Sequence, residues 1–194
     1  TVATNTVLTG SGAKVGLVTT KGYRQVLQIA RSFVPGGLGG WVIYNKSLPL
    51  APLAVTIEAD ERIGARGEVV RKLDEAKLRR DLKALGKKGI EALTVSLINS
   101  FANGEHEAQV AKIAREVLPG IPISLSSEIV PEMQEYERTI TTVANSYVRP
   151  KVETYVRNLH RQLQKTMSSV QLHILQSDGG LASGEELLDP LQVT

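Results

Sequence analysis

The chain has 194 residues, of which 42% are hydrophobic and 22% charged, with no Cys and a formal net charge of +3. The apolar fraction is too high and the net charge too low for a disordered chain, and Gly and Pro follow no collagen-like period. The lack of Cys excludes disulfide frameworks, iron–sulfur clusters and Cys nucleophiles from these residues. We therefore expect a globular protein with a substantial core.

No apolar run approaches the roughly 20 residues that span a bilayer, and no signal-peptide pattern opens the chain. We therefore expect a cytoplasmic protein without membrane contact. The sequence pI is about 9.2, but Lys and Arg are interspersed with Asp and Glu, as in residues 71–88. A nucleic-acid footprint clusters its cations, so nucleic acid is not an expected partner. The chain begins at Thr1 rather than Met, and we expect it to be a piece of a longer protein.

A β-turn-α unit is predicted near the start. Residues 1–8 fit a short helix that ends at Gly10-Ser11-Gly12. An apolar, β-branched run at residues 15–18 predicts a strand, and Thr19-Thr20-Lys21-Gly22 leads from it into a helix at residues 26–29.

An insertion is expected at residues 32–73. Its first part, residues 32–53, is rich in Gly, Pro and isolated aromatics and predicts a long loop, and such loops are usually functional. A peripheral antiparallel hairpin is predicted after this loop. Its parts are the alternating residues 55–58, the turn Gly64-Ala65-Arg66-Gly67 and residues 68–70.

Further βα units follow the insertion. Asp74 is placed to cap a helix whose apolar positions recur at i, i+4 and i+7, and a strand is predicted at residues 93–98. Asn103 can cap the next helix, which leads to a strand at residues 121–125. Strands that alternate with helices in this way predict a mixed, largely parallel sheet.

A long helix is predicted from Thr139, and Pro150 should kink it or split it in two. Residues 170–174 then predict a strand that ends in Gln176-Ser177-Asp178-Gly179-Gly180, with a last helix from near Ser183. The apolar side of the long helix is predicted to hold Ile140, Val143, Ala144, Tyr147, Val148, Tyr155, Leu159 and Leu163.

The familiar catalytic signatures are missing. The sequence has no Gly-x-Ser-x-Gly, no Walker loop and no Gly-x-Gly-x-x-Gly. Its three histidines share no ligand spacing, so no metal site is expected from this chain alone. His106 is expected to be solvated or to cap a helix, and His160 and His173 are expected to be exposed.

Two turns and one charged segment remain as candidates. Thr19-Thr20-Lys21-Gly22 and Ser177-Asp178-Gly179-Gly180 follow predicted parallel strands, where backbone amides and a helix N-terminus can receive an anion. Such turns are also needed merely to fold the chain. Residues 135–138 fit either a site or the start of a helix in which Arg138 pairs with Glu135.

Six segments, taken in order, resemble one family. They are Thr1-Val2-Ala3-Thr4-Asn5; Gly16-Leu17-Val18-Thr19-Thr20-Lys21-Gly22-Tyr23-Arg24; Asn99-Ser100-Phe101-Ala102-Asn103 with Glu105-His106-Glu107; Leu125-Ser126-Ser127-Glu128-Ile129-Val130-Pro131-Glu132; Glu135-Tyr136-Glu137-Arg138 with Thr141-Thr142-Val143-Ala144-Asn145-Ser146-Tyr147-Val148; and Gln176-Ser177-Asp178-Gly179-Gly180. The set resembles the A-type subunit of the hydantoinase/oxoprolinase family, which includes N-methylhydantoinase, 5-oxoprolinase and the acetone and acetophenone carboxylases.

This resemblance implies an α/β fold of the actin and sugar-kinase type, which is ribonuclease H-like, with two lobes and a nucleotide between them. Residues 1–127 would form the interior of the first lobe, and residues 128–194 the crossing helix and the start of the second. The family's Asp-x-Gly-Gly-Thr-x-Thr and Ser-Gly-Pro-Ala-like phosphate loops are not in these 194 residues.

The implied activity is phosphorylation of a carbonyl or amide oxygen by ATP with Mg²⁺, followed by hydrolysis of a hydantoin or N-methylhydantoin type of cyclic amide. The implied partner is a hydantoinase B-type subunit, and a homo-oligomer is a further possibility. One alternative is the A-type subunit of an acetone or acetophenone carboxylase. Another is an inactive binding or scaffold domain. Residues 35–41 depart from the Arg-Pro-containing loop of oxoprolinase-type members, which disfavours 5-oxoproline as the substrate.

The resemblance and the strand-end positions together indicate a nucleotide or substrate cleft, but they identify no catalytic residue. Asp178 stands where Asn is common in the family. The expected cleft residues are Thr4, Asn5, Thr20, Lys21, Arg24, Arg138, Ser177, Asp178, Gly179 and Gly180.

Overall fold

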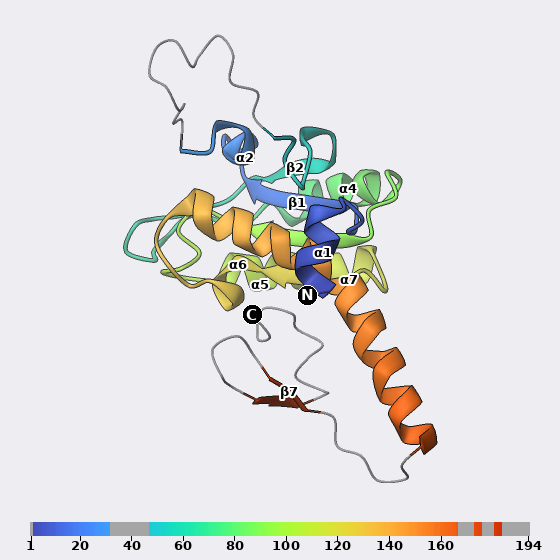
Figure 1. The fold of residues 1–194 in the computed structure, drawn as a ribbon. Coiled ribbons are helices and arrows are strands. Elements are labelled where there is room, and N and C mark those ends of the chain that lie inside the picture. Colours follow the sequence, from blue (N-terminus) through green and yellow to red (C-terminus); the bar gives the residue numbers. More distant parts are fainter. Residues whose placement is uncertain (1, 32–46, 167–172, 176–180, 184–194) are drawn as a thin grey trace, which may run out of the picture.

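A computed structural model describes residues 2–31, 47–166, 173–175 and 181–183 (Figure 1). The centre of the molecule is a four-stranded parallel sheet in the order β2-β1-β5-β6. Its strands are β1 (Val15–Thr20), β2 (Thr56–Ala59), β5 (Ala92–Ser96) and β6 (Ile123–Leu125). Every residue of β1 and β5 is buried, as expected for parallel strands covered on both faces. The predicted parallel sheet is confirmed.

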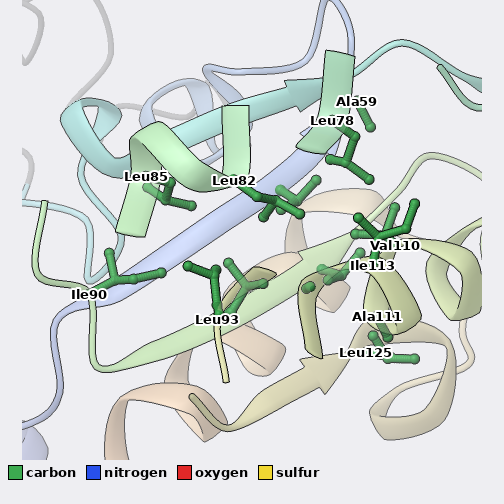
Figure 2. Close-up of a cluster of buried hydrophobic side chains, with 14 of the residues drawn as sticks. Ala59, Leu78, Leu82, Leu85, Ile90, Leu93, Val110, Ala111, Ile113 and Leu125 are labelled. Carbon is green, nitrogen blue, oxygen red and sulfur yellow. The ribbon is translucent and has the colours of Figure 1, made fainter. Parts of the chain in front are cut away.

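Helices α4 (Glu75–Gly86) and α5 (Glu105–Val117) pack together against one face of the sheet. Their apolar stripes meet Leu93 and Val95 of β5 in one hydrophobic cluster, part of which is drawn in Figure 2. The predicted cap of α4 is confirmed, because the Asp74 side chain accepts a hydrogen bond of 2.9 Å from the backbone amide of Lys77.

Helix α7 (Glu135–Thr166) covers the opposite face, with α1 (Val2–Leu8) and the single turn α2 (Val26–Ile29) packed against it (Figure 1). Pro150 lies inside one continuous helix, whose ribbon visibly changes direction along its length. The proline therefore bends the helix and does not split it. The apolar side is largely as predicted, but Tyr155 is 48% exposed.

The predicted hairpin is wrong in its first strand. Residues 56–59 join the main sheet as β2, parallel to β1, and the hairpin is formed by β3 (Arg62–Ile63) and β4 (Val69–Arg71). Alternation of apolar and polar residues predicts a strand but does not select its partner. The turn between β3 and β4 is the one expected, and Gly67 adopts a positive φ of 83° there.

The strand before Gln176 is also placed differently from the prediction. It forms β7 (His173–Leu175), which pairs antiparallel with β8 (Leu181–Ser183) in a separate two-stranded sheet. Ser183 thus ends a strand and does not start a helix. The long loop at residues 32–46, the turn at residues 176–180 and the last helix expected beyond residue 183 lie outside the described residues.

Two short elements complete the described structure, the 3₁₀ turn η2 (Leu53–Val55) and the single turn α6 (Ser126–Ile129). Within the described ranges, no helix combines the length and the apolar character needed to cross a membrane.

Candidate functional site

Polar side chains gather at the carboxyl edge of the sheet, where the central strands β1 and β5 end. Thr20 is the last residue of β1, and the backbone of residues 97 and 98 continues directly from β5. Buried side chains from α5, α6, α7 and the β2–β3 connection converge on these strand ends. We call this group the carboxyl-edge network; its members are Thr20, Glu61, His106, Glu107, Ser126 and Arg138, with the backbone of Leu97 and Ile98.

Glu107, in the first turn of α5, is fully buried. One carboxylate oxygen accepts hydrogen bonds from the Leu97 amide at 2.8 Å and the Ser126 hydroxyl at 2.7 Å. The other accepts from the Ser127 amide at 2.8 Å. A single carboxylate therefore joins the end of β5 to the start of α6.

Arg138, in the first turn of α7, is also fully buried. Its guanidinium lies 5.5 Å from the centre of the Phe101 ring. It donates hydrogen bonds to the Leu97 carbonyl at 2.8 Å, the Glu132 carbonyl at 3.0 Å, the Ser126 hydroxyl at 3.1 Å and the Glu135 carboxylate. The predicted pairing with Glu135 is confirmed, but it is one of several contacts of a buried cation.

Glu61 is the third buried ionisable residue of the network and lies between β2 and β3. One carboxylate oxygen accepts a hydrogen bond from the Thr20 hydroxyl, and the other lies 2.7 Å from Nδ1 of His106. The Thr20 hydroxyl in turn accepts from the Ile98 amide at 3.0 Å. This branch ties β1, β5 and α5 to the connection that leads into the hairpin.

Asn99, just beyond the network, has a left-handed backbone conformation with φ 61°. Its amide donates to the Glu135 carboxylate at 3.1 Å, and its side-chain amide donates to the Ile63 carbonyl at 2.9 Å. Non-glycine residues in this region are uncommon and persist where their surroundings hold them. The loop after β5 is therefore fixed from α7 and from β3.

A second, exposed group of charges lies beside the network. Asp60 binds Lys21 at 2.6 Å and Arg71 at 2.8 Å. Hydrogen bonds from Lys21 and Arg71 lower the pKa of the Asp60 carboxyl below its ordinary value. Farther along the chain, a hydrogen bond from Arg31 lowers the pKa of Glu137 in the same way.

The structure unites only part of the predicted cleft set. Thr20 and Arg138 meet in the carboxyl-edge network through the backbone of residues 97 and 98. The Lys21 side chain instead pairs with Asp60, which is not a member of the network. The Arg24 guanidinium donates to the carbonyls of Thr56 at 3.2 Å and Leu53 at 2.8 Å, which anchors the turn after β1 to the start of β2.

Thr4 and Asn5 are exposed on α1, and none of their described contacts reaches the network. Ser177, Asp178, Gly179 and Gly180 lie outside the described residues. The assignment of these residues to a cleft stays a prediction, as does the division into lobes at residue 127.

Sequence reasoning missed four buried residues of the network, namely Glu61, His106, Glu107 and Ser126. His106 was expected in solvent or at a helix cap, but it is 2% exposed and bound to Glu61. His106 and Glu107 belong to a segment that carries the family resemblance, which was an available signal. Glu61 belongs to none of those segments, and no local pattern marks it.

Binding of Mg²⁺ and a triphosphate needs metal-ligating side chains and free cations. The described residues contain no group of three or more His, Asp or Glu side chains placed to hold a metal ion. Lys21, Arg24 and Arg138 are engaged by the protein contacts given above.

The parallel sheet with helices on both faces is an α/β fold of the ribonuclease H-like class, the class to which actin and the sugar kinases belong. The family model of the hydantoinase/oxoprolinase N-terminal region matches residues 1–118, and that of hydantoinase/oxoprolinase matches residues 138–193. The chain belongs to the hydantoinase/oxoprolinase family.

Named relatives agree with this family. The gamma subunit of acetophenone carboxylase from Aromatoleum aromaticum is 34% identical over 79% of this chain and 22% of its own. A 5-oxoprolinase of Arabidopsis thaliana is 32% identical over 94% of this chain and 16% of its own. The crystal structure of the ATP-dependent caprolactamase from Pseudomonas jessenii matches with a TM-score of 0.86 at 30% identity, over 95% of this chain and 27% of that one. This chain spans about a quarter or less of the length of these relatives.

Proposed function

We propose that this chain is part of an ATP-dependent enzyme that hydrolyses a cyclic amide of the hydantoin or N-methylhydantoin type. ATP would phosphorylate a carbonyl oxygen and so turn a poor electrophile into an activated one. Family membership supports the reaction class, since caprolactamase and 5-oxoprolinase are named for caprolactam and 5-oxoproline, which are both cyclic amides.

The observation that carries the proposal is the carboxyl-edge network. Ligands of open α/β sheets bind outside the carboxyl ends of the strands, and this edge holds Glu61, His106, Glu107 and Arg138 in a buried, hydrogen-bonded arrangement. Such a network fixes the loops around a site before a ligand arrives. We assign these residues the role of shaping the edge, with the Arg138 contacts holding residues 97–100 against α7.

ATP and Mg²⁺ would be held mainly by parts of the protein other than the residues described above. The two phosphate loops implied by the resemblance are not among these 194 residues. We therefore propose that the 194-residue chain on its own has no ATPase activity and behaves as a folded domain. ATP turnover above background by the purified chain would contradict this.

A B-type subunit is the proposed partner. Two of the relatives carry subunit names, caprolactamase subunit alpha and acetophenone carboxylase gamma subunit, which supports assembly with other chains. We also propose a cytoplasmic location, which the Cys-free sequence supports.

A ketone carboxylase is the second candidate, since acetophenone carboxylase is 34% identical to this chain. In that reaction the phosphorylated enol would accept carbon derived from bicarbonate. Both candidates begin with phosphorylation by ATP. In the hydrolase, water then attacks the activated cyclic amide, whereas in the carboxylase the phosphorylated enol accepts the bicarbonate-derived carbon.

The deciding experiment measures ADP release by the full-length protein with its partner subunit. Candidate substrates are hydantoin, N-methylhydantoin, 5-oxoproline and caprolactam, and acetone or acetophenone with bicarbonate. We expect ADP release with hydantoin or N-methylhydantoin. Release only with a ketone plus bicarbonate would assign the protein to the carboxylases, and no release with any of them would contradict both candidates.

A further inference from the structure

His106 is the one histidine in the described part of the chain whose side chain is buried, with 3% of it exposed. It lies in the first turn of α5 and faces the Glu61 carboxylate, which is fully buried. An ionised carboxylate can only accept hydrogen bonds, so Nδ1 of the ring must carry the proton in this pair. The carboxylate thereby fixes both the orientation and the tautomer of the imidazole.

The second ring nitrogen, Nε2, is left with a lone pair when the ring is neutral. Within the described residues, the His106 side chain makes one hydrogen bond, the one between Nδ1 and Glu61. Nε2 is therefore an acceptor without a partner there, on a side chain that is 3% exposed. A buried polar atom without a partner costs free energy, so its retention needs a reason.

We propose that Nε2 of His106 accepts a hydrogen bond from a ligand at the carboxyl edge, and that Glu61 is the positioning residue that holds the ring proton on Nδ1, which leaves Nε2 as the acceptor of the neutral ring. The donor is an N–H or O–H group, either the ring N–H of a cyclic amide or the water that attacks it. This inference rests on the proposed function for the identity of the ligand, and on the Glu61–His106 geometry for the state of the ring.

The Thr20 hydroxyl strengthens the positioning role of Glu61. It donates to the carboxylate oxygen that His106 does not use, while accepting from the Ile98 amide. Both oxygens of Glu61 are thus occupied by donors, one from each side. The carboxylate cannot rotate away without breaking contacts to β1, so the imidazole is held relative to the ends of the central strands.

The state of the ring can be tested on the 194-residue chain. We expect ¹⁵N NMR of histidine-labelled protein at pH 8, where a free imidazole is neutral, to show His106 with its proton on Nδ1 and a bare Nε2. Glu61→Gln should disturb this tautomer, while the exposed His173 should be unaffected. A proton on Nε2 in the wild-type chain would overturn the proposal whatever the activity of the full-length protein.

Two substitutions of His106 test the contact to the ligand, because they differ in which of the two ring nitrogens they replace with a polar group. His106→Asn keeps an N–H near Nδ1 for Glu61 but removes the acceptor at Nε2, whereas His106→Gln loses the short contact to Glu61. If Nε2 contacts the ligand, His106→Asn should lower kcat/KM for ADP release at least tenfold, at an unchanged melting temperature. A purely structural histidine would instead tolerate Asn and fail with Gln.

The split between the constants identifies the donor. A raised KM at constant kcat indicates the ring N–H of the substrate, and a lowered kcat at constant KM indicates the attacking water. His160→Asn is the control, because His160 lies on α7 and hydrogen-bonds Gln164, which is not a member of the carboxyl-edge network. Wild-type constants for His106→Asn would overturn the inference. Absence of ADP release by the wild-type protein would instead contradict the proposed function, and the NMR spectrum would still decide the state of the ring.

Discussion

Two groups of charged side chains lie near the carboxyl end of β1, and they are held in different ways. In the buried group, Arg138 and Glu107 are bound mainly by backbone groups and hydroxyls from neighbouring elements. In the exposed group, Asp60 holds Lys21 and Arg71, whose side chains are 54% and 61% exposed. Both groups join carboxylates and cations from different elements, but only the first group is buried.

The difference follows from the cost of desolvation. A buried charge must recover the hydration it has lost, so it persists only where several donors or acceptors surround it. An exposed pair loses little hydration and gains little, because water and salt screen the attraction. Substitutions should therefore be costly in the carboxyl-edge network and mild around Asp60.

The largest effect is expected from Arg138→Met. The substitution leaves the Leu97 carbonyl and the Ser126 hydroxyl without their buried donor, and it removes the cation beside Glu135. We expect the free energy of unfolding to fall by about 3–5 kcal/mol, measured by urea titration.

The control for this variant is Arg157→Met on the same helix. Arg157 is 65% exposed and lies 3.6 Å from Glu153, so its loss should change stability by less than about 0.5 kcal/mol. Equal effects of the two substitutions would show that burial does not distinguish them.

An intermediate effect is expected from Glu107→Gln. The amide oxygen can still accept from the Leu97 amide and the Ser126 hydroxyl, but the NH₂ group would face the Ser127 amide, donor against donor. We expect a loss of about 1–3 kcal/mol in the same titration. Glu105→Gln, two residues earlier on the exposed side of α5, should be almost neutral; a similar loss there would point to helix electrostatics as the cause.

The local features of the fold could largely be predicted from the sequence. The i, i+4, i+7 spacing of Leu78, Leu82 and Leu85, with Asp74 before them, gave a helix and its cap in the right place. The alternation of βα units gave the parallel sheet. Pairing choices could not be predicted, since residues 56–59 are equally compatible with a hairpin and with a sheet edge, and long-range burial decides between them.

The candidate site was less accessible to prediction for the same reason. Thr20 and Arg138 were singled out from strand ends and family segments, and they do meet. Glu61 is 41 residues from Thr20 and 45 from His106 in the sequence. No local spacing pattern predicts contacts between residues so far apart. The expectation of a solvated His106 failed because a helix's first turn is usually exposed, and here the β2–β3 connection covers it.

The smallest effect, and the most pH-dependent, is expected from Asp60→Asn. Hydrogen bonds from Lys21 and Arg71 lower the pKa of Asp60 in the folded chain, so the ionised carboxylate favours the folded state at pH values above its unfolded pKa of about 4. That contribution to stability is lost as the pH falls through the lowered pKa of Asp60 in the folded chain. The melting temperature of the variant should therefore lie slightly below that of the wild type at pH 7, and the two should converge as the pH falls below the lowered pKa. Added salt at pH 7 should also narrow the difference, because both cations are exposed. If the difference in melting temperature persisted at low pH and high salt, the Asp60 side chain would act through packing and not through its charge. The exposed group would then differ from the buried network only in the size of its effect on stability.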